Sequence, residues 1–71
     1  MKVIYSENSG IYTIYGNYEP LSHLFGTLER LNIKPEWLDD KTITIDTEQN
    51  LEKFLSSYCQ LMYERLDFYH D

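Results

Sequence analysis

The residue types in this chain that could support chemistry are few, and the densest group is a run of three carboxylates around a tryptophan, Glu36-Trp37-Leu38-Asp39-Asp40. Paired carboxylates can act as a general acid and base or as metal ligands. However, adjacent residues rarely point into one pocket, and this run lacks the spaced acids and the turn glycine of a calcium loop. We therefore predict no metal site and no catalytic pair here.

The histidines and the cysteine also lack the neighbours that catalysis needs. His23 is expected on the polar side of a helix, and neither it nor His70 has a cysteine or acid at metal-ligand spacing. The single cysteine, Cys59, shows no activating base in the sequence and falls beside an apolar stripe, where cysteine usually packs as a small hydrophobic residue. We predict that the chain is not an enzyme and uses no cofactor.

The run around Trp37 has the composition of a protein-binding surface. An indole buries a large area at low entropic cost, and flanking carboxylates can pair with lysines or arginines of a partner. The alternative is that the indole packs under its loop while the two aspartates form a solvated turn. Two tyrosines at positions expected to be accessible complete the predicted partner-binding set, which is Glu36, Trp37, Asp39, Asp40, Tyr15 and Tyr63.

Composition indicates the kind of partner. The 71 residues include seven tyrosines, three phenylalanines and one tryptophan, and 12 carboxylates against six lysines and arginines give a formal net charge of −6. This charge argues against direct contact with nucleic acid or anionic membranes, whereas it complements a basic protein. The alternative is that the excess acid only keeps a small domain soluble.

The sequence also predicts a compartment. A single cysteine cannot form an intrachain disulfide, which is typical of proteins from reducing compartments. The apolar run after Met1 is too short for a signal peptide, and no stretch approaches the ~18 apolar residues of a membrane span. We therefore expect a cytoplasmic protein.

Three strands are predicted within a single domain, residues 1–71. The stretches 2–6 and 11–15 are rich in β-branched and aromatic residues and are separated by the turn-forming run Glu7-Asn8-Ser9-Gly10, which indicates a hairpin. Residues 41–45 alternate between polar and apolar side chains, as in a half-buried strand.

Two helices are predicted as well. The first begins near Pro20 and ends near Asn32, with leucines at helical spacing between them. The second is capped by Asp46 or Thr47 and runs to about Phe68. Its apolar arc spans roughly 180°, wider than contact with a sheet requires, which indicates that a partner covers part of it.

These elements predict an α+β two-layer sandwich of ββαβα order, with both helices on one face of a three-stranded, mainly antiparallel sheet. We favour the strand order 2-1-3, because it makes the third strand antiparallel to the first and antiparallel pairs are the commoner kind. The alternative order, 1-2-3, would make the third strand parallel to the second. Alternation directs one set of side chains to the helices, namely Val3, Tyr5, Tyr12, Ile14, Ile43 and Ile45.

The expected function is that of a small acidic protein-binding module. We expect an inhibitor or regulator that docks on a basic site of a larger protein, such as a nuclease or another nucleic-acid-handling or phage-defence enzyme. A site built for phosphates has a positive field that attracts carboxylates. The alternative is a homodimeric structural or regulatory subunit without an inhibitory role.

Overall fold

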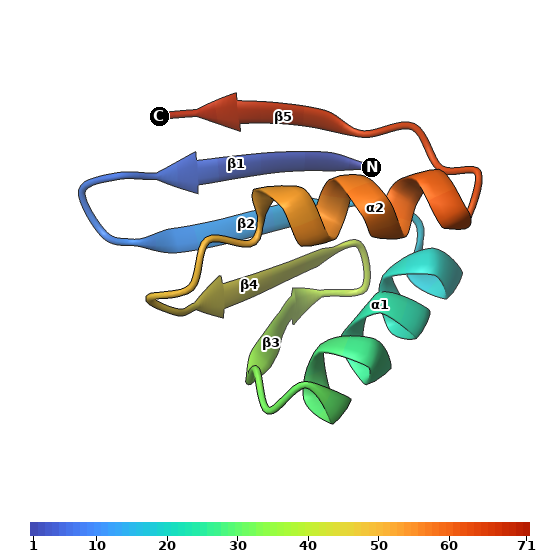
Figure 1. Ribbon diagram of the computed structural model, residues 1–71. Helices are drawn as coiled ribbons and strands as arrows, with labels where there is room; N and C mark the ends of the chain where they lie inside the picture. The colour runs from blue at the N-terminus through green and yellow to red at the C-terminus, as the bar shows by residue number, and fades with distance from the viewer.

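Five strands and two helices follow one another in ββαββαβ order in the computed structural model, which describes residues 1–71 (Figure 1). The α+β class and the placement of both helices on one face of a sheet agree with the prediction, but the sheet has five strands instead of three. The elements are β1 (Lys2–Ser6), β2 (Ile11–Tyr15), α1 (Tyr18–Arg30), β3 (Pro35–Asp39), β4 (Thr42–Asp46), α2 (Glu52–Leu61) and β5 (Asp67–His70).

The strand order is β3-β4-β2-β1-β5, so the predicted order 2-1-3 is wrong. The three strands expected from sequence lie in the order 1-2-3, and β4, the third of them, pairs with β2 antiparallel. The unforeseen strand β3 explains this arrangement. Because β2 and β3 both run antiparallel to β4, they are parallel to each other, and α1 crosses between them. The hairpin after β3 then places β4 in the gap that this crossover leaves.

The second helix makes a similar crossover, from β4 to the parallel strand β5 at the far edge of the sheet (Figure 1). The predicted helix to Phe68 is therefore wrong, since α2 ends at Leu61 and residues 67–70 form a strand. No glycine or proline interrupts the helical pattern there, so local sequence gives no stop. The edge of β1 decides the outcome: the Asp67 N–H donates to the Met1 carbonyl at 2.9 Å, and β5 pairs in parallel along β1.

The start of α2 also differs from the prediction. Asp46 belongs to β4, where it pairs with Ile11, so it cannot cap a helix. The hydroxyl of Tyr12 instead holds the chain at the helix start: it accepts a hydrogen bond from the Leu51 N–H at 3.0 Å and donates to the Gln49 carbonyl at 3.4 Å. A residue of the central sheet thereby fixes where α2 begins.

The core lies between the sheet and the two helices. The predicted inward faces of β1, β2 and β4 are confirmed, although Tyr5 is only partly buried. A side-chain hydrogen bond joins the two helices, between His23 Nδ1 and the Tyr58 hydroxyl at 2.6 Å. The buried cluster consists of Val3, Tyr12, Ile14, Leu21, Leu24, Leu28, Ile33, Ile43, Ile45, Leu51, Leu55, Tyr58 and Cys59.

The Tyr12 hydroxyl gives a direct test of this arrangement. Tyr12→Phe leaves the Leu51 N–H buried without an acceptor, so we expect a loss of about 1–3 kcal/mol in the free energy of unfolding. Urea denaturation measures it. The control is Tyr5→Phe, because the Tyr5 hydroxyl makes no hydrogen bond. We expect it to change the free energy of unfolding by no more than about 0.5 kcal/mol. Equal effects of the two changes would contradict the role assigned to Tyr12.

Candidate protein-binding surfaces

Trp37, the centre of the predicted binding run, packs against α1. Its ring stacks on Tyr18 and on Phe25, with centroid separations of 5.3 and 5.2 Å and interplanar angles of 25° and 14°. The indole remains 37% exposed. Much of its surface therefore closes the edge of the sheet, and only the rest is free for a partner.

The carboxylates near Trp37 do not share its surface. Glu36 precedes it in β3 and so points to the opposite face of the sheet. Asp39 and Asp40 lie in the β3–β4 hairpin, where Asp39 Oδ1 accepts a hydrogen bond from the Lys41 N–H at 2.8 Å. The three acids are exposed, as predicted, but the run forms an edge strand and a turn instead of one acidic patch around an indole.

Tyr15 lies on the face of the sheet that no helix covers. It pairs with Lys2 of β1 and with Thr42 of β4. The Lys2 ammonium stands 5.7 Å from the Tyr15 ring centroid and 5.8 Å from that of Tyr69, within range of cation–π attraction. The Tyr15 side chain is 40% exposed, so the predicted accessibility is confirmed, with a cation already beside the ring.

Tyr63 is the most exposed of the large hydrophobic residues, at 98%. It follows α2 with φ +55°, in the left-handed region, and its N–H donates to the Gln60 carbonyl while the Glu64 N–H donates to that of Cys59. This is a Schellman motif, whose left-handed position is usually glycine or asparagine. The equivalent position after α1 is Asn32, with φ +63°. A bulky residue there costs about 1–2 kcal/mol, and no contact of its ring offsets the cost.

The residues before Tyr63 extend this exposed surface. Leu61 is 77% exposed and Met62 40%. We call Leu61, Met62 and Tyr63 the α2 terminal surface. The sequence placed these residues on a helix that continued past them, so it predicted the exposure of Tyr63 but not the turn that presents it.

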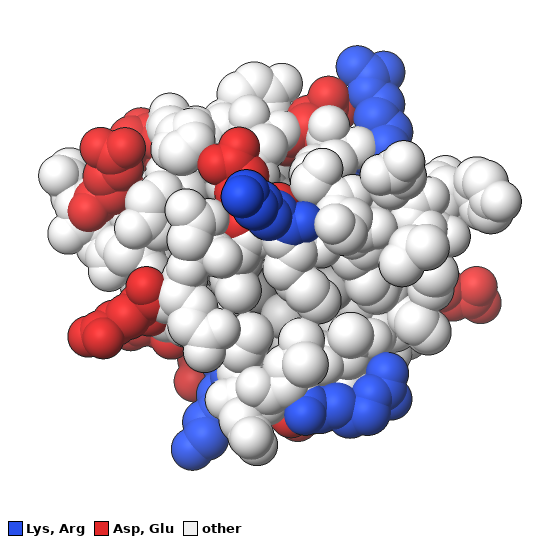
Figure 2. All heavy atoms as spheres, in the orientation of Figure 1, with Lys and Arg blue, Asp and Glu red and all other residues white.

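Carboxylates gather at the opposite end of the sheet. Asp46 ends β4, the Glu7 N–H donates to the Asp71 carbonyl, and two more acids lie at or just before the start of α2. Figure 2 shows acidic groups on the upper and middle left edge of the molecule. We call this set the acidic end; its members are Glu7, Asp46, Glu48, Glu52 and Asp71.

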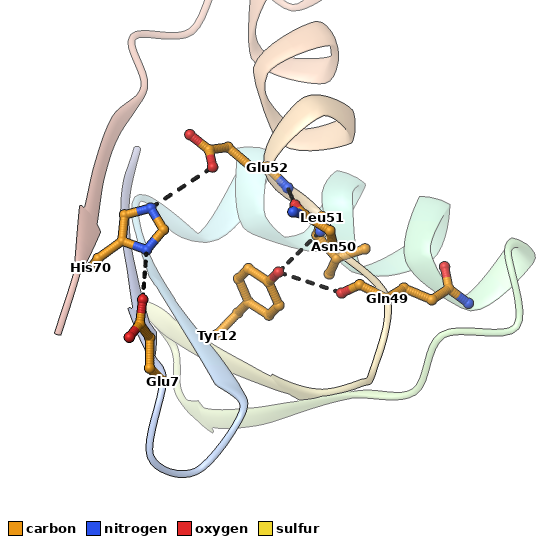
Figure 3. A network of polar contacts seen from close by, with 7 residues as sticks. All are labelled: Glu7, Tyr12, Gln49, Asn50, Leu51, Glu52 and His70. Carbon is orange, nitrogen blue, oxygen red and sulfur yellow. Dashed lines mark hydrogen bonds and ion pairs between the residues drawn. The ribbon is translucent and has the colours of Figure 1, made fainter.

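His70 lies among these carboxylates. Its Nδ1 is 3.8 Å from Glu7 Oε1 and its Nε2 is 3.8 Å from Glu52 Oε1, so a protonated ring would form two ion pairs (Figure 3). Neither Glu7 nor Glu52 lies near His70 along the chain. These acids come from the β1–β2 turn and from α2, and only the strand pairing of β5 with β1 brings them beside the ring.

A groove runs between α2 and β5. Its volume is about 780 Å³, and it is open to solvent. At the acidic end it adjoins a smaller hollow of about 110 Å³, which shares Asn50, Glu52 and Phe68 with it. The sequence did not indicate this groove, because one of its walls is β5, a segment that was expected to be helical. Its lining is Asn50, Glu52, Lys53, Ser56, Leu66 and Phe68.

Cys59 is buried in the core and lies 3.9 Å from the sulfur of Met1. Burial raises the pKa of its thiol above the ordinary value, which disfavours the nucleophilic thiolate. No cluster of three or more His, Cys, Asp or Glu residues is placed to hold a metal ion. Neither helix is long and apolar enough to cross a membrane.

Comparison of the chain with protein-family models, with curated proteins and with solved structures finds no match.

The buried thiol leads to a pH prediction. Burial is the main cause that raises the pKa of both Cys59 and Tyr58, from ordinary values of 9.0 and 10.0. Well below pH 9 both groups are protonated whether the chain is folded or not. Above it the unfolded chain releases these protons first, so the free energy of unfolding falls as pH rises.

Urea denaturation at neutral pH and at successive values above pH 9 measures this fall. We also expect Ellman's reagent to react slowly with Cys59 in the native chain at neutral pH and rapidly in urea. Fast reaction in the native chain would mean that the thiol is activated.

The strained backbone of Tyr63 leads to a stability prediction. Tyr63→Gly relieves about 1–2 kcal/mol of left-handed strain and adds about 0.5–1 kcal/mol of chain entropy cost. We expect a net gain of about 0.5–1 kcal/mol and a rise of several degrees in Tm. Asn32→Gly, at the matching position after α1, should gain less, because asparagine tolerates this conformation. A loss of stability in Tyr63→Gly would show that the ring makes stabilising contacts.

Proposed function

We propose that this chain is a small acidic protein-binding module, an inhibitor or regulator that docks on a basic site of a larger protein and performs no catalysis. The observation that carries the proposal is Tyr63, a fully exposed aromatic ring on a strained backbone. Residues in strained backbone conformations that no contact within the protein offsets are concentrated at functional positions. Tyrosine is also among the residues that dominate binding energy at protein interfaces.

The α2 terminal surface supplies the apolar part of such a contact. Leu61, Met62 and Tyr63 are consecutive and all exposed, and methionine adapts readily to different partner surfaces. Asp39 and Asp40 of the hairpin lie at the same end of the sheet, because the Gly16 N–H donates to the Lys41 carbonyl and β2 ends beside this turn. They can pair with cations of a partner at the rim.

The net charge of −6 favours a basic partner. A protein site built for nucleic-acid phosphates carries a positive field that attracts and orients carboxylates, which raises the association rate. Nucleases and other nucleic-acid-handling enzymes, including those of phage defence, have such sites. We therefore propose an enzyme of this kind as the partner.

A homodimer is the second candidate. The outer face of the sheet has no covering helix, and it carries Ile4, Ile11, Tyr15 and Tyr69 in a partly exposed state. Burying this face against a second copy would remove apolar surface from water. A mass of two chains by light scattering across a dilution series would favour this candidate.

The test uses the chain as bait for proteins of its native host, followed by binding measurements with the purified partner. We expect capture of a basic protein whose affinity falls steeply with added salt. Tyr63→Ala should weaken binding about 10-fold or more while leaving Tm unchanged. The control is Leu31→Ala, an exposed leucine at the end of α1, with affinity unchanged. Equal binding by the Tyr63 variant and wild type would contradict the proposal.

A further inference from the structure

The two edges of the sheet differ in how they are protected. Edge strands expose unpaired backbone groups, and proteins commonly block them with proline or a β-bulge. The edge strand β3 has both, Pro35 and a bulge between Trp37 and Asp39. The other edge strand, β5, has the sequence Asp-Phe-Tyr-His and pairs with β1 in unbroken register. Only β5 is therefore open to a further strand.

The direction of the backbone groups in β5 follows from its pairing. The Asp67 N–H donates to the carbonyl of Met1, just before β1, at 2.9 Å, and the Asp71 N–H donates to that of Tyr5 within β1, at 2.8 Å. Because backbone groups alternate along a strand, those of Phe68 and His70 point away from β1. Two N–H groups and two carbonyls are thus free at this edge.

The groove lies beside these free groups. The side chains of Phe68 and His70 face the helix layer and line the groove or its adjoining hollow, and Lys53 and Ser56 of α2 form the facing wall. A strand added to β5 would place every second side chain against this groove. In peptide recognition by strand addition, backbone hydrogen bonds provide affinity, and pockets for alternate side chains provide specificity.

Charge decides between two possible occupants. A second copy of β5, paired antiparallel through Phe68 and His70, would place Asp67 opposite Asp71 twice and join two chains of net charge −6. Like charges directly opposite in a sheet are destabilising. A strand that carries lysine or arginine would meet Glu7, Glu52 and Asp71 at the acidic end instead.

We propose that β5 accepts an extended segment of the partner protein as a sixth strand, with cationic side chains alternating with apolar β-branched ones. This inference rests on the proposed function, since it assigns how a basic partner is held. The backbone of Phe68 and His70 hydrogen-bonds the added strand, and Glu7 and Glu52 bind its cations.

The probe is an acetylated six-residue peptide in which valine alternates with lysine, added to the isotope-labelled chain. We expect NMR shifts and slowed hydrogen exchange at the Phe68 and His70 amides, with other strands unaffected. A peptide with glutamine in place of lysine should bind about 10-fold more weakly. No change at these two amides with millimolar lysine peptide, or equal binding of both peptides, overturns the proposal.

Two variants of one residue isolate the backbone contribution. His70→Pro removes an outward N–H that β1 does not use, so the fold should persist, whereas His70→Ala keeps that N–H and loses the same imidazole. We expect His70→Pro to lose lysine-peptide binding and His70→Ala to retain it within about threefold. Equal binding of the lysine peptide by the two variants overturns binding through the backbone of β5.

The native partner separates this inference from the proposed function. A captured basic protein could lose affinity for the Tyr63→Ala variant and yet bind the His70→Pro variant as tightly as the wild type. That result would overturn strand addition and leave the proposed function standing. Protection of the Phe68 amide that rises with chain concentration, without peptide, overturns it in favour of a second copy. The absence of any salt-sensitive protein partner overturns the proposed function itself.

Discussion

The apolar face of the sheet must be covered, and only two helices are available to cover it. Val3, Ile14, Ile43 and Ile45 are fully buried under α1 and α2, so both helices must run across the same face. Each helix does so as a crossover between parallel strands. A crossover needs a strand at its far end, and this requirement produces β3 at one edge and β5 at the other. The need to bury the central strands therefore also accounts for the two edge strands.

The two edges then take different roles. At β3, Trp37 stacks between two α1 rings and the bulged hairpin closes the edge, so most of the aromatic surface there stabilises the monomer. At β5, the chain presents free backbone groups, an open groove and the carboxylates of the acidic end. The surfaces available to a partner are therefore concentrated around α2 and the strand that follows it.

Most of the central structure could be predicted from residue pattern. The hairpin β1–β2, the strand β4, the first helix and the inward faces follow from strict alternation or helical spacing, because each is fixed by its own side chains. The candidate site could be predicted less well. Tyr15 and Tyr63 are exposed as expected, but the indole and its acids are divided among different surfaces. The groove and the contacts of His70 had no signal in the sequence, since they join residues from α2, from β5 and from loops that lie far apart in the chain.

The sequence by itself determined the α+β class, the acidic charge, and which side chains of β1, β2 and β4 enter the core. Tertiary structure alone decided that residues 35–39 and 67–70 are strands and that α2 ends at Leu61. Both edge segments have local patterns compatible with other structures, a loop in one case and a helix in the other. Their conformation is set by hydrogen bonds to a neighbouring strand, which exist only once the central strands have assembled.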